Sequence, residues 1–542
     1  MANFNQPPPL QDYDLFAADQ GLLHALSAIA PGIETDELHE LGRLAGTPEM
    51  IGLGADANRY EPELHAYDRY GNRIDEVRFH PSWHVLMSKA TKYGLHAAPW
   101  RDRAAHAHLR RAVKFYLWSQ VEAGHLCPIS MTYAAVPAIE HTPAVARDWT
   151  SKLAQCEYDP RLLPIAEKTS ALCGMGMTER QGGSDVRANV TRAQRLSDGY
   201  YALEGHKWFC SAPMSDAFLV LAQADGGLSC LLVARALEDG TRNPFAIQRL
   251  KDKLGNRSNA SSEIEFHGTR ARLIGEEGRG VQTIVEMVNG TRLDCIIGSA
   301  ALLRQALAQA IHHARHRSTF GKRLIDHVLM QNVLADLALE SEAATAIWVR
   351  LAHATDDAPH NTHAAALRRI GTAVGKFYVC KRAPVASAEA LECLGGNGYV
   401  EESIMPRLYR EAPLNSIWEG SGNINALDVL RILQKQPDAV EAFLIELAPA
   451  VGESRIASAV RSLQHDIAQS DELEWRARSI VERMALVWQA SLLLQHAPNY
   501  VSDGFIASRL NAEGGRTFGT LPIKTALRAI VDRAAPHEVA AL

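Results

Sequence analysis

The chain of 542 residues has no uninterrupted apolar stretch long enough to cross a bilayer. Its first residues, Met1 to Pro9, lack the positively charged start and apolar run of a signal peptide. There is no internal repeat, and no low-complexity block beyond the run of Pro7 to Pro9. We therefore expect a folded protein that stays in the cytoplasm and does not enter a membrane.

Paired cysteines and an excess of positive charge are also missing. The eight cysteines are dispersed, without a CxxC pair or zinc-type spacing, and are predicted to be reduced core thiols. His312, His313 and His316 put two imidazoles four residues apart without an evident third ligand, so we assign no metal site. The net charge of -6 argues against a protein dominated by non-specific phosphate binding, but it leaves a local basic face open.

The remaining patterns indicate helices, then strands, then helices again. Residues 1–170 are predicted to form an N-terminal helical domain, and residues 171–280 a β-barrel domain with short apolar runs separated by Asp198-Gly199 and Asp225-Gly226-Gly227. Residues 281–436 show long helical periodicities typical of a bundle. Residues 437–542 are predicted to form an additional helical domain. The fold class is thus mostly α with a central β domain.

A glycine-rich segment, Gly174 to Asp185, opens the β region. Its glycines and hydroxyls offer donors at close range to a phosphate or heterocycle, yet a simple domain hinge is as good an interpretation of the segment alone. Its spacing is neither a Walker loop nor a Rossmann fingerprint.

A second segment, Ser416 to Asn423, places the acid Glu419 between apolar and small residues. Partial desolvation would raise the pKa of such a carboxylate toward that of a general base. The spacing from Ser416 to Glu419 also fits a capping box at the start of a helix. The segment alone favours the cap.

Five segments together resemble the acyl-CoA dehydrogenase superfamily of flavoproteins. They match its motifs in the right order over about 250 residues, which is far more specific than any one motif. The segments are Met177-Thr178-Glu179-x-x-Gly182-Gly183-Ser184-Asp185, Gly205 to Ser211, Arg317-Ser318-Thr319-Phe320-Gly321-Lys322, Leu394 to Tyr399, and Ile417-Trp418-Glu419-Gly420-Ser421. The resemblance implies an acyl-CoA dehydrogenase-like fold and FAD as the cofactor.

Within this superfamily the chain is most similar to the AidB branch, which is associated with the adaptive response to alkylating agents. Residues 78–84, 126–132 and 250–260 carry this similarity, and the tail beyond residue 436 also fits it. Members of this branch are expected to bind duplex DNA through the tail. From Lys435 onward, however, two Lys and nine Arg face thirteen Asp and Glu. A DNA-binding surface would therefore require that several arginines of the tail share one helical face. Candidates are Arg455, Arg461, Arg476, Arg478 and Arg483.

The resemblance also implies roles for individual residues. Glu419 becomes the base that removes the α-proton of an acyl-CoA while a hydride leaves the β-carbon for flavin N5. Arg317 and Gln331 are implied to reach the pyrophosphate and adenosine from a neighbouring subunit, so a homotetramer is expected. The implied flavin contacts are Met177, Thr178, Gly183, Ser184, Phe209, Ser211, Arg317, Phe320, Gln331, Gly395, Gly396, Trp418, Gly420, Ser421 and Asn423.

The implied substrate site departs from the family pattern. Asn289 stands where the family commonly has an Asp ahead of Thr-Arg, whereas Arg292 is retained. Asn289 and Arg292 are the candidate substrate-binding residues. Two functions follow as hypotheses: an FAD-dependent acyl-CoA dehydrogenase-like oxidoreductase, or a DNA-binding flavoprotein of the alkylation response with little turnover.

Overall fold

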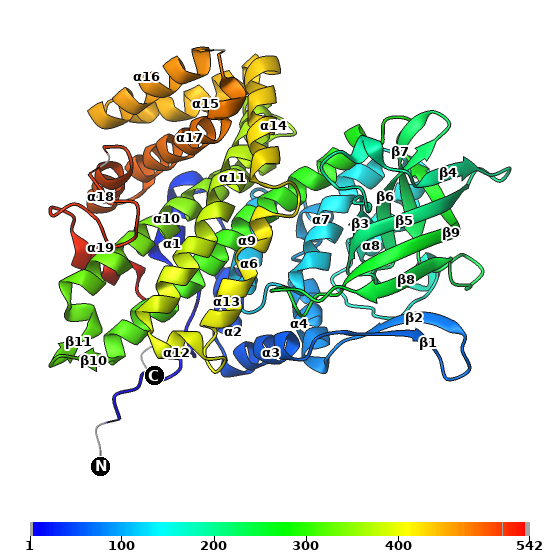
Figure 1. The fold of residues 1–542 in the computed structure, drawn as a ribbon, viewed down its shortest axis with the longest axis horizontal. Helices are drawn as coiled ribbons and strands as arrows, with labels where there is room; N and C mark the ends of the chain where they lie inside the picture. Colours follow the sequence, from blue (N-terminus) through cyan, green and yellow to red (C-terminus); the bar gives the residue numbers. More distant parts are fainter. Residues whose placement is uncertain (1–3, 470, 512, 537–542) are drawn as a thin grey trace. The chain divides into compact units, whose positions relative to one another are not determined.

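The computed structural model describes residues 4–469, 471–511 and 513–536. The chain divides into two compact units, each assembled from separate stretches of sequence (Figure 1). The first unit combines residues 4–51, 105–121 and 292–536, and the second combines residues 52–104 and 122–291. Two helices contribute to both units, namely α3 (Pro48–Arg59) and α9 (Gly280–His316).

The second unit is built around a closed β-barrel. Strand pairing runs from β6 through β4, β5, β9 and β7 and returns to β6, while β3 extends along β6 and β8 along β9. The barrel strands are β3 (Cys173–Gly176), β4 (Arg192–Arg195), β5 (Tyr201–Ser211), β6 (Ala217–Ala224), β7 (Gly227–Ala234), β8 (Phe245–Leu250) and β9 (Ser261–Ile274). The predicted β-barrel is confirmed.

Local sequence explains the barrel. Alternate residues along β5 are buried, as in Tyr201 and Leu203, and join Phe218, Val233 and Ile264 in one apolar core. Both predicted turns lie between paired strands, since Gly199 (φ 85°) follows β4 and Gly227 (φ 110°) follows β6. Positive φ is costly for other residues, so these glycines terminate the strands where the sequence predicts.

Helices and a hairpin complete the second unit. The helix α7 is buried along most of its length and packs against β3 and α8. The remaining elements are the hairpin strands β1 (Glu63–Tyr67) and β2 (Arg73–Arg78), α4 (Pro81–Lys92), α5 (Ala98–Arg101), α7 (Leu126–Glu140), α8 (Pro143–Leu153), η1 (Ile165–Glu167) and η2 (Val186–Ala188). The hairpin is a correction, because its residues were predicted to belong to a helical region. Asp75 and Arg73 attach it to Ile247 of β8 by hydrogen bonds of 3.1 and 2.7 Å.

The first unit is a helical bundle around α10 (Val328–Asp357) and α11 (Thr362–Cys393). Their apolar faces are covered by α1 and α6 and by the helices that follow, and Ile296 of α9 lies close to Gly375 of α11. The other elements are α1 (Gln20–Ile29), α2 (Asp36–Ala45), α6 (Ala107–Ser119), β10 (Ser318–Thr319), β11 (Lys322–Arg323), η3 (Leu324–Asp326), α12 (Gly396–Tyr399), α13 (Met405–Glu411), η4 (Leu414–Ser416), α14 (Gly422–Lys435), α15 (Pro437–Leu447), η5 (Ala448–Ala450), α16 (Ser454–Ala468), α17 (Leu473–His496), α18 (Asn499–Arg509) and α19 (Leu527–Ala534).

Buried ion pairs join the C-terminal helices to the bundle. Arg509 of α18 pairs with Asp336 and with Glu340 at 3.4 Å, and both carboxylates lie on α10. Arg350 of α10 donates to Glu446 of α15 at 2.8 Å. Residues 437–536 therefore belong to the same compact unit as the bundle, and their separation into a domain of their own stays a prediction.

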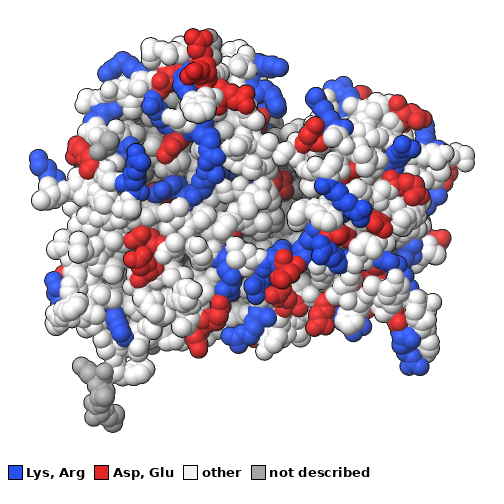
Figure 2. Space-filling model, viewed as in Figure 1, with Lys and Arg blue, Asp and Glu red and all other residues white. Residues whose placement is uncertain are grey.

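Other sequence-based expectations concern the thiols and charges. All eight cysteines are free, and seven of them are buried. None of the helices that the structure describes combines the length and apolarity needed to cross a bilayer. On the face drawn in Figure 2, basic and acidic side chains are interspersed over most of the surface.

Candidate active site

In the second unit the glycine-rich loop runs beside the end of β5. The backbone N–H of Trp208 donates a hydrogen bond to the Thr178 carbonyl at 2.8 Å, which connects the loop to the strand that carries Phe209 and Ser211. A Cβ added to Gly183 would lie 2.4 Å from Thr178 Oγ1, so a larger residue at this position would force the Thr178 side chain to move. Thr178, Gly183, Phe209 and Ser211 are thus brought to one edge of the barrel.

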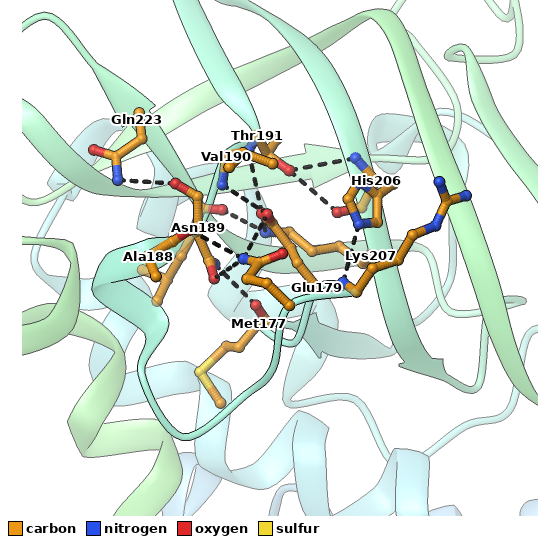
Figure 3. A network of polar contacts seen from close by, with 12 residues as sticks. Met177, Glu179, Ala188, Asn189, Val190, Thr191, His206, Lys207 and Gln223 are labelled. Carbon is orange, nitrogen blue, oxygen red and sulfur yellow. Dashed lines mark hydrogen bonds and ion pairs between the residues drawn. The ribbon is translucent and has the colours of Figure 1, made fainter.

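A buried ion pair holds this loop in place (Figure 3). Lys207 Nζ of β5 lies 2.7 Å from Glu179 Oε1, and both side chains are fully buried. Glu179 also accepts hydrogen bonds from the backbone of Val190 at 2.7 Å and Thr191 at 3.3 Å. Burial alone would raise the pKa of Glu179, but Lys207 and these donors outweigh it and lower the pKa to about 2. Glu179 is therefore a structural anion, not a proton carrier.

The remaining predicted residues of this unit lie around the loop or on α9. The Phe209 ring is 51% exposed although the next residue, Cys210, is buried, and the Ser211 hydroxyl lies 3.3 Å from that of Ser261. The Met177 carbonyl accepts a hydrogen bond from Asn189 at 2.9 Å, whereas Ser184 is exposed. Asn289, on the part of α9 that belongs to this unit, is half-buried.

In the first unit Glu419 lies on a sharply constrained turn ahead of α14. Its φ of 58° is in the left-handed region, which residues other than glycine seldom adopt, and Gly420 follows at φ 101°. Ser416 belongs to η4, and α14 begins only at Gly422 with Ser421 as its N-cap. The capping box from Ser416 to Glu419 is therefore wrong, because no helix starts between them.

Three side chains bind the carbonyl groups of this turn. Arg292 Nε donates to the Glu419 carbonyl at 2.9 Å. Lys376 Nζ and Asn425 Nδ2 donate to the Gly420 carbonyl at 2.8 and 2.7 Å. These hydrogen bonds compensate the cost of the left-handed backbone and hold the turn in one conformation.

Arg292 is itself oriented by a buried carboxylate. Its Nη1 donates to Asp428 of α14 at 3.1 Å, and Arg369 of α11 donates to the same carboxylate at 2.6 Å. Burial opposes ionisation of Asp428, but Arg369 and Arg292 outweigh it and lower its pKa. Asp428 is thus charged at neutral pH and keeps Arg292 directed at Glu419.

Glu419 and Lys376 both affect the Cys295 thiol of α9. Burial raises the pKa of this thiol, the charge of Lys376 opposes the shift, and the Glu419 carboxylate adds a smaller increase. The Trp418 indole next to Glu419 donates to Asn415 at 2.9 Å, which fixes the aromatic side chain beside the turn. The predicted residues Arg292, Trp418, Glu419, Gly420, Ser421 and Asn423 are therefore assembled in one place.

The other predicted residues of this unit form a second group around α12 and the β10–β11 turn, seen at the lower left of Figure 1. Phe320 at the tip of that turn is 96% exposed, and Gln331 donates to the Ile325 carbonyl at 2.9 Å. Arg317 bonds to the Asn5 carbonyl, and the adjacent Gln6 receives a hydrogen bond of 2.7 Å from Asn397. Gly395 and Gly396 have open space where a side chain would be.

Sequence analysis did not single out the residues that hold these segments. Lys207 lies in the segment Gly205 to Ser211 but the resemblance implies no role for it, and Lys376, Arg369 and Asp428 lie outside all five motif segments. Each is a charged residue with less than a third of its side chain exposed, within a helix or strand. A charged residue at a predicted core position indicates a buried ion pair or hydrogen bond. Its partner cannot be inferred from the sequence, because the partner lies far away along the chain.

Four of the five tail arginines proposed for DNA contact are bound to other groups of the protein. Arg455 pairs with Glu453 at 2.8 Å and with Asp503 at 2.9 Å, and Arg483 pairs with Asp466. Arg476 donates to three carbonyl groups, those of residues 466, 469 and 471. Arg478 donates to Asn423 at 2.9 Å.

Comparison with known protein families gives three matches. Residues 5–160 match the N-terminal domain of the adaptive response protein AidB. Residues 174–269 match the middle domain of acyl-CoA dehydrogenases, and residues 278–434 match their C-terminal domain.

Individual relatives agree with these matches. AidB of Escherichia coli (strain K12) is 46% identical over 94% of this chain and 95% of that protein. The structure of Bd2924 in its apo form has a TM-score of 0.84 at 30% identity, covering 92% of this chain and all of that one. Caenorhabditis elegans ACDH-11 in complex with C11-CoA has a TM-score of 0.86 at 25% identity, covering 99% of this chain and 93% of that one.

Proposed function

The chain belongs to the acyl-CoA dehydrogenase family, with an AidB-type N-terminal domain, and from this premise we propose that it is an FAD-dependent dehydrogenase of acyl-CoA thioesters. Glu419 is its catalytic base. The observation that carries the proposal is the fixed turn at Glu419, where Arg292 and Lys376 bind successive carbonyl groups at 2.9 and 2.8 Å. A carboxylate on a turn held in this way is presented in one direction, as a general base requires.

The residues at the predicted cofactor positions fit a flavin. The Phe209 ring is half-exposed and offers a flat apolar surface, and the adjacent loop carries the hydroxyls of Thr178 and Ser184. Asn425 Oδ1 is buried without a hydrogen-bond partner among the described residues, which leaves an acceptor for a ligand hydroxyl near Gly420. We expect Thr178, Ser184, Phe209 and Ser211 to hold the isoalloxazine and ribityl parts of FAD.

Substrate oxidation divides between the protein and the cofactor. A bound FAD would supply the acceptor for the hydride that leaves the substrate β-carbon. Glu419 accepts the proton from the α-carbon, and the two electrons of that C–H bond form the double bond of the enoyl thioester. Arg292 keeps the Glu419 backbone in place, and Asp428 keeps Arg292 in place. The complex of C. elegans ACDH-11 with C11-CoA supports an acyl-CoA as the substrate class.

Anaerobic titration of the purified protein with a panel of acyl-CoAs tests this function. At least one member should bleach the flavin absorbance. Glu419→Gln should keep its FAD and slow bleaching by roughly 100-fold or more, because the general base is lost. Glu402→Gln, which changes an exposed acid in the same unit, serves as the control and should bleach at the wild-type rate. The proposal fails if no acyl-CoA of a broad panel reduces the flavin.

A homotetramer is part of the proposal. Arg317, Phe320 and Gln331 lie on or just after the β10–β11 turn, in another group than Glu419. The family resemblance implies that such residues reach the pyrophosphate and adenosine of a flavin in a neighbouring subunit, so the site would be shared between subunits. The exposed Phe320 at the turn supports such a contact. Light scattering should give the mass of about four chains in solution.

The alternative, a DNA-binding flavoprotein of the alkylation response, has weaker support. Carboxylates already neutralise Arg455 and Arg483, so fewer tail arginines are available for phosphates than their number suggests. Fluorescence anisotropy with a short duplex tests it. Binding that weakens steeply between about 50 and 200 mM salt and is lost in a chain truncated after residue 436 would establish this alternative.

A further inference from the structure

The start of the chain lies on the second group of predicted cofactor residues. We name residues 4–9 the N-terminal strap; they form neither helix nor strand and are followed by Leu10, whose side chain is buried. The strap contacts Ser318 of β10, which lies 313 residues beyond Asn5 in sequence, and also α12. Figure 1 shows this blue segment below α12, near β10 and β11. The strap therefore joins parts of one unit that are remote in sequence.

Asn5 binds β10 much as a neighbouring strand would. Its Nδ2 donates to the Ser318 carbonyl at 2.7 Å, and its Oδ1 accepts a hydrogen bond from the Ser318 N–H at 2.8 Å. The Asn5 carbonyl accepts a hydrogen bond from Nη1 of Arg317. One residue of the strap thus satisfies both backbone groups of Ser318 and orients the adjacent arginine, which the family resemblance directs at the flavin pyrophosphate.

Two further contacts attach the strap to α12 and α9. Asn397 Nδ2 of α12 donates to Gln6 Oε1 at 2.7 Å. His312 Nε2 of α9 lies 2.8 Å from the Pro8 carbonyl, and since a carbonyl can only accept, this nitrogen carries a proton. The imidazole that the sequence offered as a possible metal ligand thus holds the strap instead.

The proline run keeps the strap extended. Pro7 to Pro9 have φ fixed near −65° and lack a backbone N–H, so they neither continue a helix nor pair fully as a strand. A chain restricted in this way loses less conformational entropy when it docks than a flexible one does. A few hydrogen bonds at the surface therefore suffice to hold this segment in place.

The strap leaves the surface of the second group open. Phe320 at the tip of the β10–β11 turn is 96% exposed. A Cβ added to Gly395 or Gly396, which precede and begin α12, would meet no atom within 4 Å. The strap thus binds the two turns without filling the space beside them. Such an arrangement supports a site and does not block it.

We propose that Asn5 and Gln6 are positioning residues for the adenosine monophosphate (AMP) half of FAD. They hold the turn that carries Arg317 and the turn at Gly395 and Gly396 in one arrangement, so less ordering is needed when the nucleotide binds. The inference rests on the proposed function, in which these two turns contact FAD. The strap itself lies outside both matched dehydrogenase domains, the first of which begins at residue 174.

Affinities of the flavin-free full chain for FAD and for FMN test this role. The two flavins share the isoalloxazine ring, the ribityl chain and one phosphate, and only FAD carries the AMP half. Fluorescence quenching gives both affinities for the wild type, for Asn5→Ala and for the double variant that also carries Gln6→Ala. Gln11→Ala, which removes an exposed amide just after the strap, is the matched control.

The double variant should bind FAD roughly ten-fold more weakly than the wild type, because hydrogen bonds to both turns are lost. Its affinity for FMN should not change, and Gln11→Ala should bind both flavins like the wild type. FMN is the control for stability, since a general loss of structure would weaken the binding of both flavins. The inference is overturned if FAD affinity stays within about two-fold of the wild type, or if FMN affinity falls by the same factor.

Hydrogen exchange measured by mass spectrometry is a second test, independent of FMN binding and of activity. Because coupling between two binding events is reciprocal, FAD should stabilise the docked strap. It should therefore slow exchange of the Ser318 N–H, which donates to Asn5 Oδ1, in the wild type and in Gln11→Ala. In Asn5→Ala the acceptor is gone, so most of this slowing should disappear; equal slowing in Asn5→Ala would contradict the role of the strap.

Flavin bleaching by acyl-CoAs keeps this inference apart from the proposed function. Bleaching of the wild type without an FAD-specific loss of affinity in the strap variants would overturn the inference alone. An FAD-specific loss, with no acyl-CoA able to bleach the wild type, would overturn the dehydrogenase function and leave the strap its role in cofactor binding.

Discussion

Replacing Lys207 by Met should destabilise the β-barrel unit far more than the loss of a surface charge. Lys207 Nζ lies 2.7 Å from Glu179 and also donates to the Leu221 carbonyl at 2.7 Å, and both side chains of the ion pair are fully buried. Without the ammonium, Glu179 is left as a buried and uncompensated charge. A cost of about 3–5 kcal/mol is expected for such a change.

The pH dependence of stability gives a second estimate of what this ion pair contributes, and it predicts whether stability rises or falls with pH. The pKa of Glu179 is lowered from 4.5 to about 2. At about 1.4 kcal/mol for each pKa unit, the charged carboxylate contributes roughly 3 kcal/mol at neutral pH. This contribution is present above the unfolded pKa of 4.5 and is lost as the pH falls toward 2. In Lys207→Met the ammonium no longer opposes the effect of burial on the pKa of Glu179, so the loss of stability on acidification below pH 4.5 should be smaller than in the wild type or absent.

Urea denaturation followed by circular dichroism at a series of pH values measures both effects. Arg180→Met is the matched control, because the pair of Arg180 with Glu265 spans 3.3 Å at the surface and should be worth less than about 1 kcal/mol. Glu179→Gln combined with Lys207→Met should recover part of the lost stability, since no buried charge remains. If Lys207→Met shifts the denaturation midpoint no more than Arg180→Met and keeps the wild-type pH trend, the reasoning about this ion pair is refuted.

Three further substitutions test the first unit. Asp428→Asn releases Arg292 from its buried carboxylate. Flavin reduction in stopped-flow experiments should then slow roughly ten-fold, while FAD affinity stays within about two-fold of the wild type. An unchanged rate would show that Asp428 does not position Arg292. Gly420→Ala places a side chain on a residue with a φ of 101°. A thermal melt should show that the unfolding free energy falls by about 1–3 kcal/mol. A melting temperature equal to that of the wild type would contradict the claim that this turn is strained. Arg509→Met removes the partner that α18 provides for Asp336 and Glu340 of α10. In limited proteolysis, residues 437–536 should then be cleaved earlier than the helical bundle. Cleavage of the two regions at the same time would show that these ion pairs do not hold the tail.

Much of the architecture could be predicted because it depends on neighbours in sequence. The apolar runs at 218–221 and 231–233 are strands β6 and β7, and the glycines between them make the predicted turn. The periodic stripe from Leu302 to Ala314 lies on α9. The hairpin at 63–78 was missed because its strands are short and only partly buried, and because distant segments hold it: Leu64 and Val77 pack against the barrel core, and Asp75 and Arg73 bond to Ile247.

The sequence by itself determined the family, the order of helical and β regions and the candidate base, because motifs and turn glycines act over a few residues. Only the tertiary structure decided that no helix starts between Ser416 and Glu419. It also decided which charged residues form ion pairs with each other. Glu179 meets Lys207 from 28 residues away, and Arg292 meets Asp428 from 136 residues away. The stability of such pairs depends on how deeply folding buries them, and burial is a property of segments that are far apart in the chain.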